Sequence, residues 1–161
     1  VLLMPELSLT APAMFANAAR FMDAYHTVLA PLCELTQLPP AAVDILLFLA
    51  NNPEHDTAAS VCRMRGLKPG IVSFHVDRLV TEGYLLRQSV PGDRRKTMLT
   101  CTEKAAPIIT QGRALQRAFA EQLTGGLSEE DLEHFRRCIA VFDRNIERIR
   151  TGTCKRRETQ P

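Results

Sequence analysis

The chain of 161 residues has no Cys-x-x-Cys pair and no apolar run that approaches the length of a membrane span. Its five cysteines are odd in number and widely spaced, which argues against a disulfide framework and against a zinc site. The four histidines show no metal-ligand spacing. There is no glycine loop of the kind that holds phosphate and no nucleophile with a recognisable base. We therefore expect no enzyme, no metal and no cofactor.

The amino-terminal residues also lack the features of a targeting sequence. Val1–Met4 is apolar, but no basic region precedes it and Pro5 interrupts it at once. We therefore expect no signal peptide. Dispersed cysteines fit a protein of the reducing cytosol, and we expect no membrane partner.

The charge of the chain is unevenly distributed. The composition is ordinary for a soluble protein, with 45% hydrophobic and 24% charged residues and a net charge of +2. Between Ser60 and Lys104, however, there are nine Lys or Arg and four Asp or Glu, whereas the rest of the chain has eleven and fourteen. Concentrated positive charge is typical of a surface that contacts nucleic-acid phosphates. Taken alone, the asymmetry would equally describe a solvated charged surface.

The most informative stretch begins with a helix-turn-helix pattern. Asp56 or Thr57 is expected to cap a short helix that ends near Arg65, and residues 66–68 form a turn. Pro69 suits the first position of the next helix, and Gly83 stands where that helix should stop. The apolar residues of this second helix recur at helical spacing: Val72, Val76, Leu79 and Val80.

A β-hairpin is predicted directly after this helix. Its strands are Tyr84–Gln88 and Lys96–Cys101, joined by a basic turn, Ser89–Arg95. A helix that fits a major groove, beside a hairpin that offers arginine to a minor groove, is a winged helix-turn-helix.

Long amphipathic helices are expected before and after this winged helix-turn-helix in the chain. They cover about 12–35 before it, and about 102–124 and 129–150 after it, while a nearly wholly apolar helix over about 41–50 is expected to be central to the core. The fold class is therefore mainly α with a small β-hairpin wing. Pro31 is expected to kink or end the first helix, and Pro107 to make the start of the helix after the hairpin irregular.

The outer helices carry apolar stripes that a soluble monomer would leave exposed. Packing against a second copy covers them and places two reading helices about one DNA turn apart, roughly 34 Å. The alternative is that the helices pack on each other within one chain. The residues expected at the dimer interface are Phe15, Met22, Leu132, Phe135, Ile139, Phe142 and Ile146.

These features divide the chain into five parts. They are a lead-in (1–9), an N-terminal dimerisation helix (10–38), a winged helix-turn-helix DNA-binding domain (39–101), C-terminal dimerisation helices (102–150) and a tail (151–161).

At this point the sequence resembles the MarR family of transcriptional regulators, named after the multiple antibiotic resistance regulator. The resemblance covers about residues 10–150. It is carried, in order and spacing, by Val72-Ser73, Val76–Leu79, Glu82–Leu85, Asp93–Arg95 and Thr102–Lys104. The last two segments are the most specific part. Phe74 departs from the family pattern, which often has a polar or basic residue there.

The resemblance implies a homodimer in a bacterial or archaeal cytosol that reads a pseudo-palindromic operator in double-stranded DNA. It also implies a small effector, often phenolic or otherwise aromatic, that weakens DNA binding. The candidate pocket residues are Phe21, Tyr25, His26 and Phe48, for which ordinary core packing is the alternative. Cys33 has no basic neighbour in the sequence, so we expect an inert thiol.

DNA contacts are expected from the reading helix and from the hairpin tip. The residues are Lys68, Pro69, Gly70, Ser73, Phe74, Arg78, Asp93, Arg94, Arg95 and Lys96. Three alternatives stay open: Arg78 forms an ion pair with Asp77 or Glu82, Phe74 packs on the wing instead of a thymine methyl, and the arginine turn is merely solvated. His75 is interpreted as a partly buried structural residue.

The leading hypothesis is a homodimeric transcriptional repressor, released from DNA by a small ligand. The alternative is a helical dimeric module that binds a small molecule or a protein and has weakened DNA binding.

Overall fold

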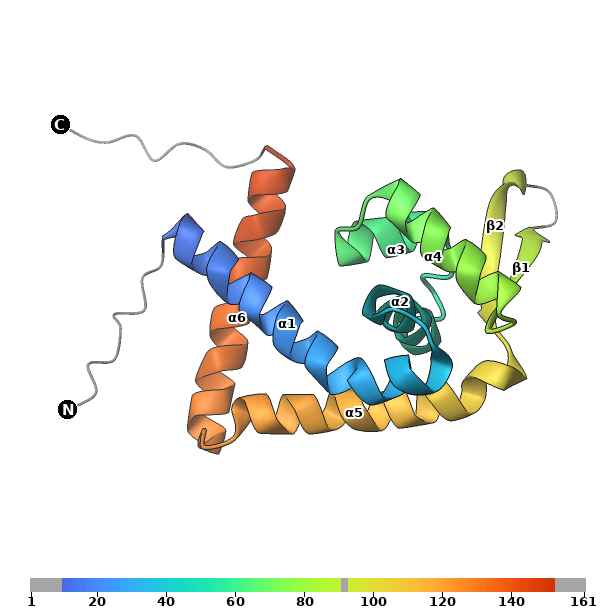
Figure 1. Cartoon of the computed structure of the whole chain (residues 1–161). Helices are drawn as coiled ribbons and strands as arrows, with labels where there is room; N and C mark the ends of the chain where they lie inside the picture. Colours follow the sequence, from blue (N-terminus) through green and yellow to red (C-terminus); the bar gives the residue numbers. More distant parts are fainter. Residues whose placement is uncertain (1–9, 91–92, 153–161) are drawn as a thin grey trace. The chain divides into compact units, whose positions relative to one another are not determined.

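The chain is mainly helical with one β-hairpin, as the sequence predicts. The computed structural model describes residues 10–90 and 93–152. Their elements are α1 (Ala11–Thr36), α2 (Pro40–Asn51), α3 (Ala58–Arg65), α4 (Pro69–Thr81), β1 (Leu85–Val90), β2 (Asp93–Cys101), η1 (Glu103–Ala105), α5 (Ala106–Thr124) and α6 (Glu129–Arg150) (Figure 1). The predicted lead-in and residues 153–161 of the predicted tail lie outside the described residues.

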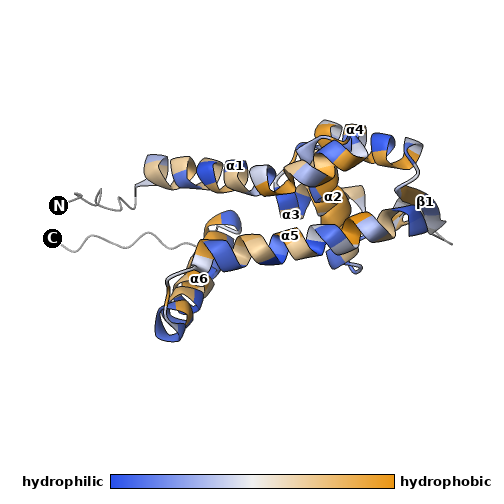
Figure 2. Ribbon diagram, turned by 60° about the horizontal axis from the view of Figure 1, so that its bottom comes forward, coloured by the Kyte–Doolittle hydropathy of each residue, from blue (hydrophilic) through white to orange (hydrophobic). Residues whose placement is uncertain are grey.

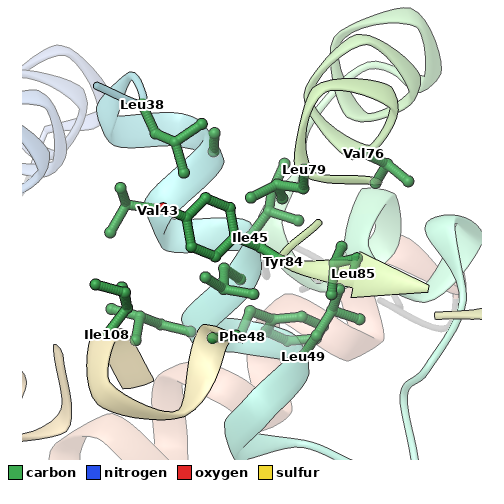
Figure 3. Packing of buried hydrophobic residues seen from close by; sticks show 14 of the residues in the cluster. Leu38, Val43, Ile45, Phe48, Leu49, Val76, Leu79, Tyr84, Leu85 and Ile108 are labelled. Atoms are coloured by element: carbon green, nitrogen blue, oxygen red, sulfur yellow. The ribbon is translucent and has the colours of Figure 1, made fainter. Parts of the chain in front are cut away.

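Helix α2 is the centre of the core. Ala42–Leu49 are all buried, because a nearly continuous apolar run leaves the helix no polar side (Figure 2). Figure 3 shows α2 side chains packed among those of the surrounding elements. Among them are Ile45 and Phe48 of α2, Leu79 of α4, Leu85 of β1 and Ile108 of α5. The prediction that this helix is central is confirmed.

Helix α5 approaches α2 closely at Gly112. A Cβ atom at this position would overlap the side chain of Leu47, which is fully buried. Glycine therefore permits the two helices to pack at this distance without displacing a core side chain.

Helices α3 and α4 form the predicted helix-turn-helix. The Thr57 hydroxyl accepts a hydrogen bond from the Ser60 backbone N–H (3.1 Å) and caps α3. Gly66 ends α3 with φ of 64°, a left-handed conformation that glycine adopts at little cost. Helix α4 begins at Pro69, and its buried row is Val72, Val76 and Leu79.

The hairpin is held against the helix-turn-helix at its base. Gly83, with φ of 77°, turns the chain out of α4. Strands β1 and β2 are antiparallel, with Leu85 opposite Cys101. The Leu99 backbone N–H donates to the Asp56 carbonyl (2.7 Å), which attaches β2 to the loop before α3.

The structure tests three predicted details: the length of the strands, the effect of Pro31 on α1 and the start of the helix after the hairpin. The strands are longer than predicted, so that Asp93, Arg94 and Arg95, expected in the turn, belong to β2. Pairing of the two strands continues to Val90 and Asp93 and overrides the local turn propensity. Pro31 does not end α1, which continues to Thr36. The irregular start after the hairpin is confirmed, because η1 precedes α5.

The chain divides into two units. The larger ends at Phe119 and contains the core, the helix-turn-helix and the hairpin, and the smaller begins at Ala120 and contains the end of α5 and all of α6. In the smaller unit, Ser128 and Asp131 form a capping box at the start of α6, with both hydrogen bonds at 3.1 Å. The Ser128 hydroxyl (2.7 Å) and the Ser128 backbone N–H both donate to the Asp131 carboxylate and lower the pKa of this carboxyl. No residue of α6 is buried.

No single helix in the described ranges is long and apolar enough to cross a membrane, and α1 with α2 meets the length and composition criteria only as a pair bent by 96°. In the same ranges, no three His, Cys, Asp or Glu side chains are grouped as metal ligands would be.

Candidate nucleic-acid interface

The first two turns of α4 carry five of the predicted DNA-contact residues. Lys68 is the N-cap, Pro69 and Gly70 lie in the first turn, and Ser73 and Phe74 follow. All five are exposed, and 63% of the Phe74 surface is accessible. The structure therefore places these residues together at the amino-terminal end of a helix, the part that contacts base edges in helix-turn-helix proteins.

Ile71 belongs to the same exposed region but was not predicted. Its side chain is 46% exposed, one helical turn before Phe74. The sequence contained the necessary information, because Ile71 falls outside the buried row that begins at Val72. Isoleucine is more often a core residue, so its type alone did not indicate that Ile71 is exposed.

Arg78 joins α4 to the end of α1. Its Nη2 atom donates to the backbone carbonyl of Gln37 (2.5 Å), the C-cap residue of α1. Among the described residues, Arg78 forms the alternative ion pair with neither Asp77 nor Glu82, and Asp77 pairs with Arg87 of β1. The bond to Gln37 uses one of the five N–H groups of the guanidinium, so the DNA contact of Arg78 stays a prediction.

The pairing of Asp77 with Arg87 also joins α4 to the hairpin. A second link lies near the base of the hairpin, where Lys104 Nζ donates to the Glu82 carbonyl (2.6 Å) and stands 4.6 Å from the centre of the Tyr84 ring. Helix α4 is thus tied to α1 on one side and to the wing on the other.

His75 is partly buried, as predicted. Its Nδ1 atom is buried without a hydrogen-bond partner among the described residues, and the ring meets that of Phe74 edge-on at 5.2 Å. Burial lowers the pKa of this imidazole, and the positive charge of Arg78 lowers it further. The neutral form is therefore favoured in the folded protein.

The tip of the hairpin is described through its backbone. Asp93, Arg94, Arg95 and Lys96 are the first four residues of β2, with Asp93 opposite Val90. Their side chains lie outside the described part of the structure, so their contacts with DNA remain predictions.

A pocket of about 240 Å³ lies between α1, α3 and α5 within the larger unit. Its lining is largely aromatic: Phe119 lies 5.3 Å from Phe21 and 5.5 Å from Tyr25, ring centre to ring centre. The lining residues are Phe21, Met22, Tyr25, Arg65, Gln116 and Phe119. Phe21 and Tyr25, two of the four predicted pocket residues, therefore line one cavity.

The other two predicted pocket residues lie elsewhere. His26 lines a neighbouring pocket of about 190 Å³, to which Met22, Asp44 and Arg65 also contribute. Phe48 is 4% exposed and belongs to the core, with the Arg65 guanidinium 5.2 Å from its ring centre. Phe48 is not among the lining residues of either pocket, because its position in the middle of α2 directs it into the core.

A polar network lies beside the two pockets. Arg65 Nη2 donates to Asp44 Oδ1 (2.8 Å), and Asp44 is 6% exposed. Tyr25 Oη accepts a hydrogen bond from Gln116 Nε2 (2.7 Å), and Gln116 Oε1 accepts one from Asn51 Nδ2 (2.9 Å). Burial raises the pKa of Asp44, while the charge of Arg65 and a hydrogen bond from Tyr25 oppose the rise. Burial also raises the pKa of Tyr25.

Sequence reasoning missed Arg65, Gln116 and Phe119 because they reach the pocket from segments far from α1 in the chain. One indication was present: Asp44 interrupts an otherwise apolar helix, so it requires a buried partner. Nothing in the sequence, however, identifies Arg65 as that partner from 21 residues away.

The residues predicted at a dimer interface are mostly exposed in the single chain. Phe15 is 75% exposed on α1, and Leu132 is half-buried on α6. The other exposed members are Met22, Phe135, Ile139, Phe142 and Ile146. Cys33 is partly buried and its burial raises the pKa of the thiol, which agrees with the expected inert cysteine.

Comparison with known proteins adds a family match and a shared fold. Residues 36–96 match the model of the MarR family. A MarR transcriptional regulator from Methanosarcina mazei Go1 superposes with a TM-score of 0.69 at 17% identity, over 83% of this chain and 96% of that one.

Two further structures carry bound molecules. One, described as a MarR family transcriptional regulator from Listeria monocytogenes complexed with 26mer DNA, has a TM-score of 0.73 at 11% identity, over 92% of this chain and 98% of that one. CouR from Rhodococcus jostii RHA1, bound to p-coumaroyl-CoA, has a TM-score of 0.65 at 21% identity, over 83% and 91%. At these identities the likeness establishes the fold.

The ion pair between the buried Asp44 and the partly exposed Arg65 side chain makes stability depend on pH when its cation is removed. In Arg65→Met, we expect the pKa of Asp44 to rise further above its unfolded value. A carboxyl whose folded-state pKa lies above its unfolded value destabilises the fold in full above the folded pKa. This cost decreases as the pH falls below the folded pKa and is gone below the unfolded pKa. The free energy of unfolding should therefore drop by about 2 kcal/mol at neutral pH, between the values typical of exposed and buried ion pairs, and by less near pH 4, measured by urea denaturation.

The control is Arg63→Met, which removes an exposed guanidinium from the same helix and should have little effect at either pH. An equal loss for Arg65→Met at both pH values would show that the Asp44 charge is not the cause.

Proposed function

The chain carries the winged helix-turn-helix of the MarR family, and we propose that it is a homodimeric transcriptional repressor that reads a pseudo-palindromic operator and is released by a small aromatic ligand. The observation that carries the proposal is the exposed amino-terminal end of α4, a helix that the wing follows directly, in the segment that concentrates positive charge. The Listeria protein of the same fold was solved in complex with DNA, which supports double-stranded DNA as the partner.

In this proposal each part of the interface has a separate task. Lys68 and Ser73 contact phosphate near the start of α4, and Arg78 contacts phosphate or base edges. One of Arg94 and Arg95 enters the minor groove while the other meets phosphate. Lys96, Pro69 and Gly70 complete the contact surface. The carboxylate of Asp93 orients one of the arginines.

The apolar stripe of α6 supports a dimer. Phe135, Ile139, Phe142 and Ile146 are each between 39% and 54% exposed, and they recur every three or four residues on one side of the helix. Such a stripe is costly to leave in water, and a second copy would cover it. A two-fold dimer would present two α4 helices to successive major grooves.

The aromatic pocket supports a small effector. Its three rings would enclose an aromatic group, while Gln116 and Arg65 would meet polar atoms of the ligand. CouR, of the same fold, binds p-coumaroyl-CoA, which supports an aromatic ligand for this chain. Arg65 lies at the end of α3, so a ligand there would contact the helix-turn-helix directly.

The wing assignment is tested with Arg94→Ala and Arg95→Ala. Each should weaken binding to the DNA that flanks the protein's own gene, and each should reduce the slope of log affinity against log salt by about one unit. Fluorescence anisotropy at several salt concentrations, beside a scrambled duplex, measures both effects. The matched control is Arg137→Ala with Arg144→Ala, which removes two charges from α6 on the side away from its apolar stripe. If the Arg94→Ala, Arg95→Ala double variant binds like the parent, the wing does not contact DNA.

The dimer is tested with Ile139→Glu and Phe142→Glu together. The two carboxylates would have to be buried in the interface, so the double variant should run at the chain mass of 18.0 kDa instead of twice that mass. Light scattering after size exclusion measures the mass, and operator affinity should fall with it. Arg144→Glu, on the opposite side of α6, should leave the dimer intact. A parent protein that is itself monomeric would refute the proposed assembly.

The pocket is tested with a panel of small phenols. Those that bind should raise the melting temperature and release the protein from DNA. Gln116→Leu removes a hydrogen-bonding group from the lining and should weaken phenol binding by about two- to tenfold. Gln111→Leu, an exposed position on the same helix, is the matched control. A response that is identical in both variants would place the ligand elsewhere.

A further inference from the structure

We propose that α4 reads its operator chiefly through the C5-methyl groups of thymine, with Ile71 and Phe74 as the reading side chains. The inference rests on the proposed DNA binding and adds the chemistry by which bases are distinguished.

Two large apolar side chains stand exposed where a recognition helix meets base edges. Ile71 is 46% and Phe74 is 63% exposed, and both lie in the first two turns of α4. Residues three apart in a helix are neighbours on its surface. Together they form a small apolar patch at the end of the helix that enters the groove, separate from the buried row of Val72, Val76 and Leu79.

The charged side chains within α4 lie beyond its first two turns, and each bonds to another part of the protein. Asp77 pairs with Arg87, and Arg78, in the last turns of the helix, donates to the Gln37 carbonyl. His75 is partly buried. Ser73 is the exposed polar side chain between Ile71 and Phe74, and α4 contains no Asn, Gln or Lys.

The exposed side chains in the first two turns of α4 match thymine better than the other bases. Guanine is typically read by a bidentate Arg or Lys, and adenine by Asn or Gln. Thymine alone presents a methyl group in the major groove, where it is contacted by apolar side chains. The patch is therefore complementary to T·A pairs.

The positive charge around the patch of Ile71 and Phe74 favours DNA over a protein as its binding partner. The patch directly follows Lys68 at the N-cap of α4, and it lies in the segment with nine basic and four acidic residues. An apolar protein-docking surface would not require that charge, whereas a duplex does.

The test begins by selecting duplexes that the full chain binds from a random pool. Each thymine of the selected site is then replaced by deoxyuridine, which keeps the base pair and removes only the methyl group. The parent should lose about fourfold in affinity for each contacted methyl, the value of one buried methylene-sized group. In Phe74→Ala and Ile71→Ala the loss should vanish at the positions that each side chain contacts.

Two controls separate contact from other effects. Phe74→Leu keeps an apolar side chain and should retain part of the sensitivity. Leu35→Ala, which removes a 63% exposed apolar side chain from α1, should respond to deoxyuridine as the parent does. Since Ile71 and Phe74 are exposed, their variants should keep the parent's melting temperature.

Three other results would each refute a part of the proposal. If the parent binds thymine and deoxyuridine duplexes equally, methyl reading is wrong while DNA binding stands. If the methyl dependence persists in the Ile71→Ala, Phe74→Ala double variant, the methyl groups act through DNA shape and the inference is wrong. If no duplex is selected, the proposed function fails and this inference fails with it.

Discussion

The burial of α2 is the constraint on which the larger unit depends. Every residue from Ala42 to Leu49 is buried, so each neighbouring element must supply an apolar surface, and α4 does so with one row of side chains. The same constraint explains the position of Arg65. A carboxylate within this helix, Asp44, needs a cation at the edge of the core, and Arg65 at the end of α3 supplies it. The core thereby fixes both α4 and one wall of the pocket.

Much of this architecture could be predicted because it depends on local sequence patterns. The helix limits follow from Pro69, Gly66 and Gly83, whose backbone requirements are independent of tertiary contacts. The capping box of α6 is similarly local. The strands were predicted too short, because the turn was assigned to Ser89–Arg95 from local composition, whereas strand pairing depends on contacts between segments and reaches Asp93.

The site was predicted only in part, for the same physical reason. Residues in the first turns of α4 could be identified, since exposure follows from helical periodicity. The partners of Arg78 and Asp77 could not, because Gln37 and Arg87 become neighbours only when the chain is folded. Phe48 follows the alternative of core packing, which the sequence left open because an aromatic residue in an apolar helix has the same sequence pattern whether it lines a cavity or fills the core.

The separation of the two sides of α4 has a consequence for how such a protein can change. Val72, Val76 and Leu79 hold the helix in place, whereas Ile71, Ser73 and Phe74 contribute little to the core. If α4 reads DNA as proposed, substitutions at the second group would alter the recognised sequence without a large loss of stability. A duplicated gene could acquire a new operator by exchanging three side chains, and a designer could redirect the same scaffold in the same way.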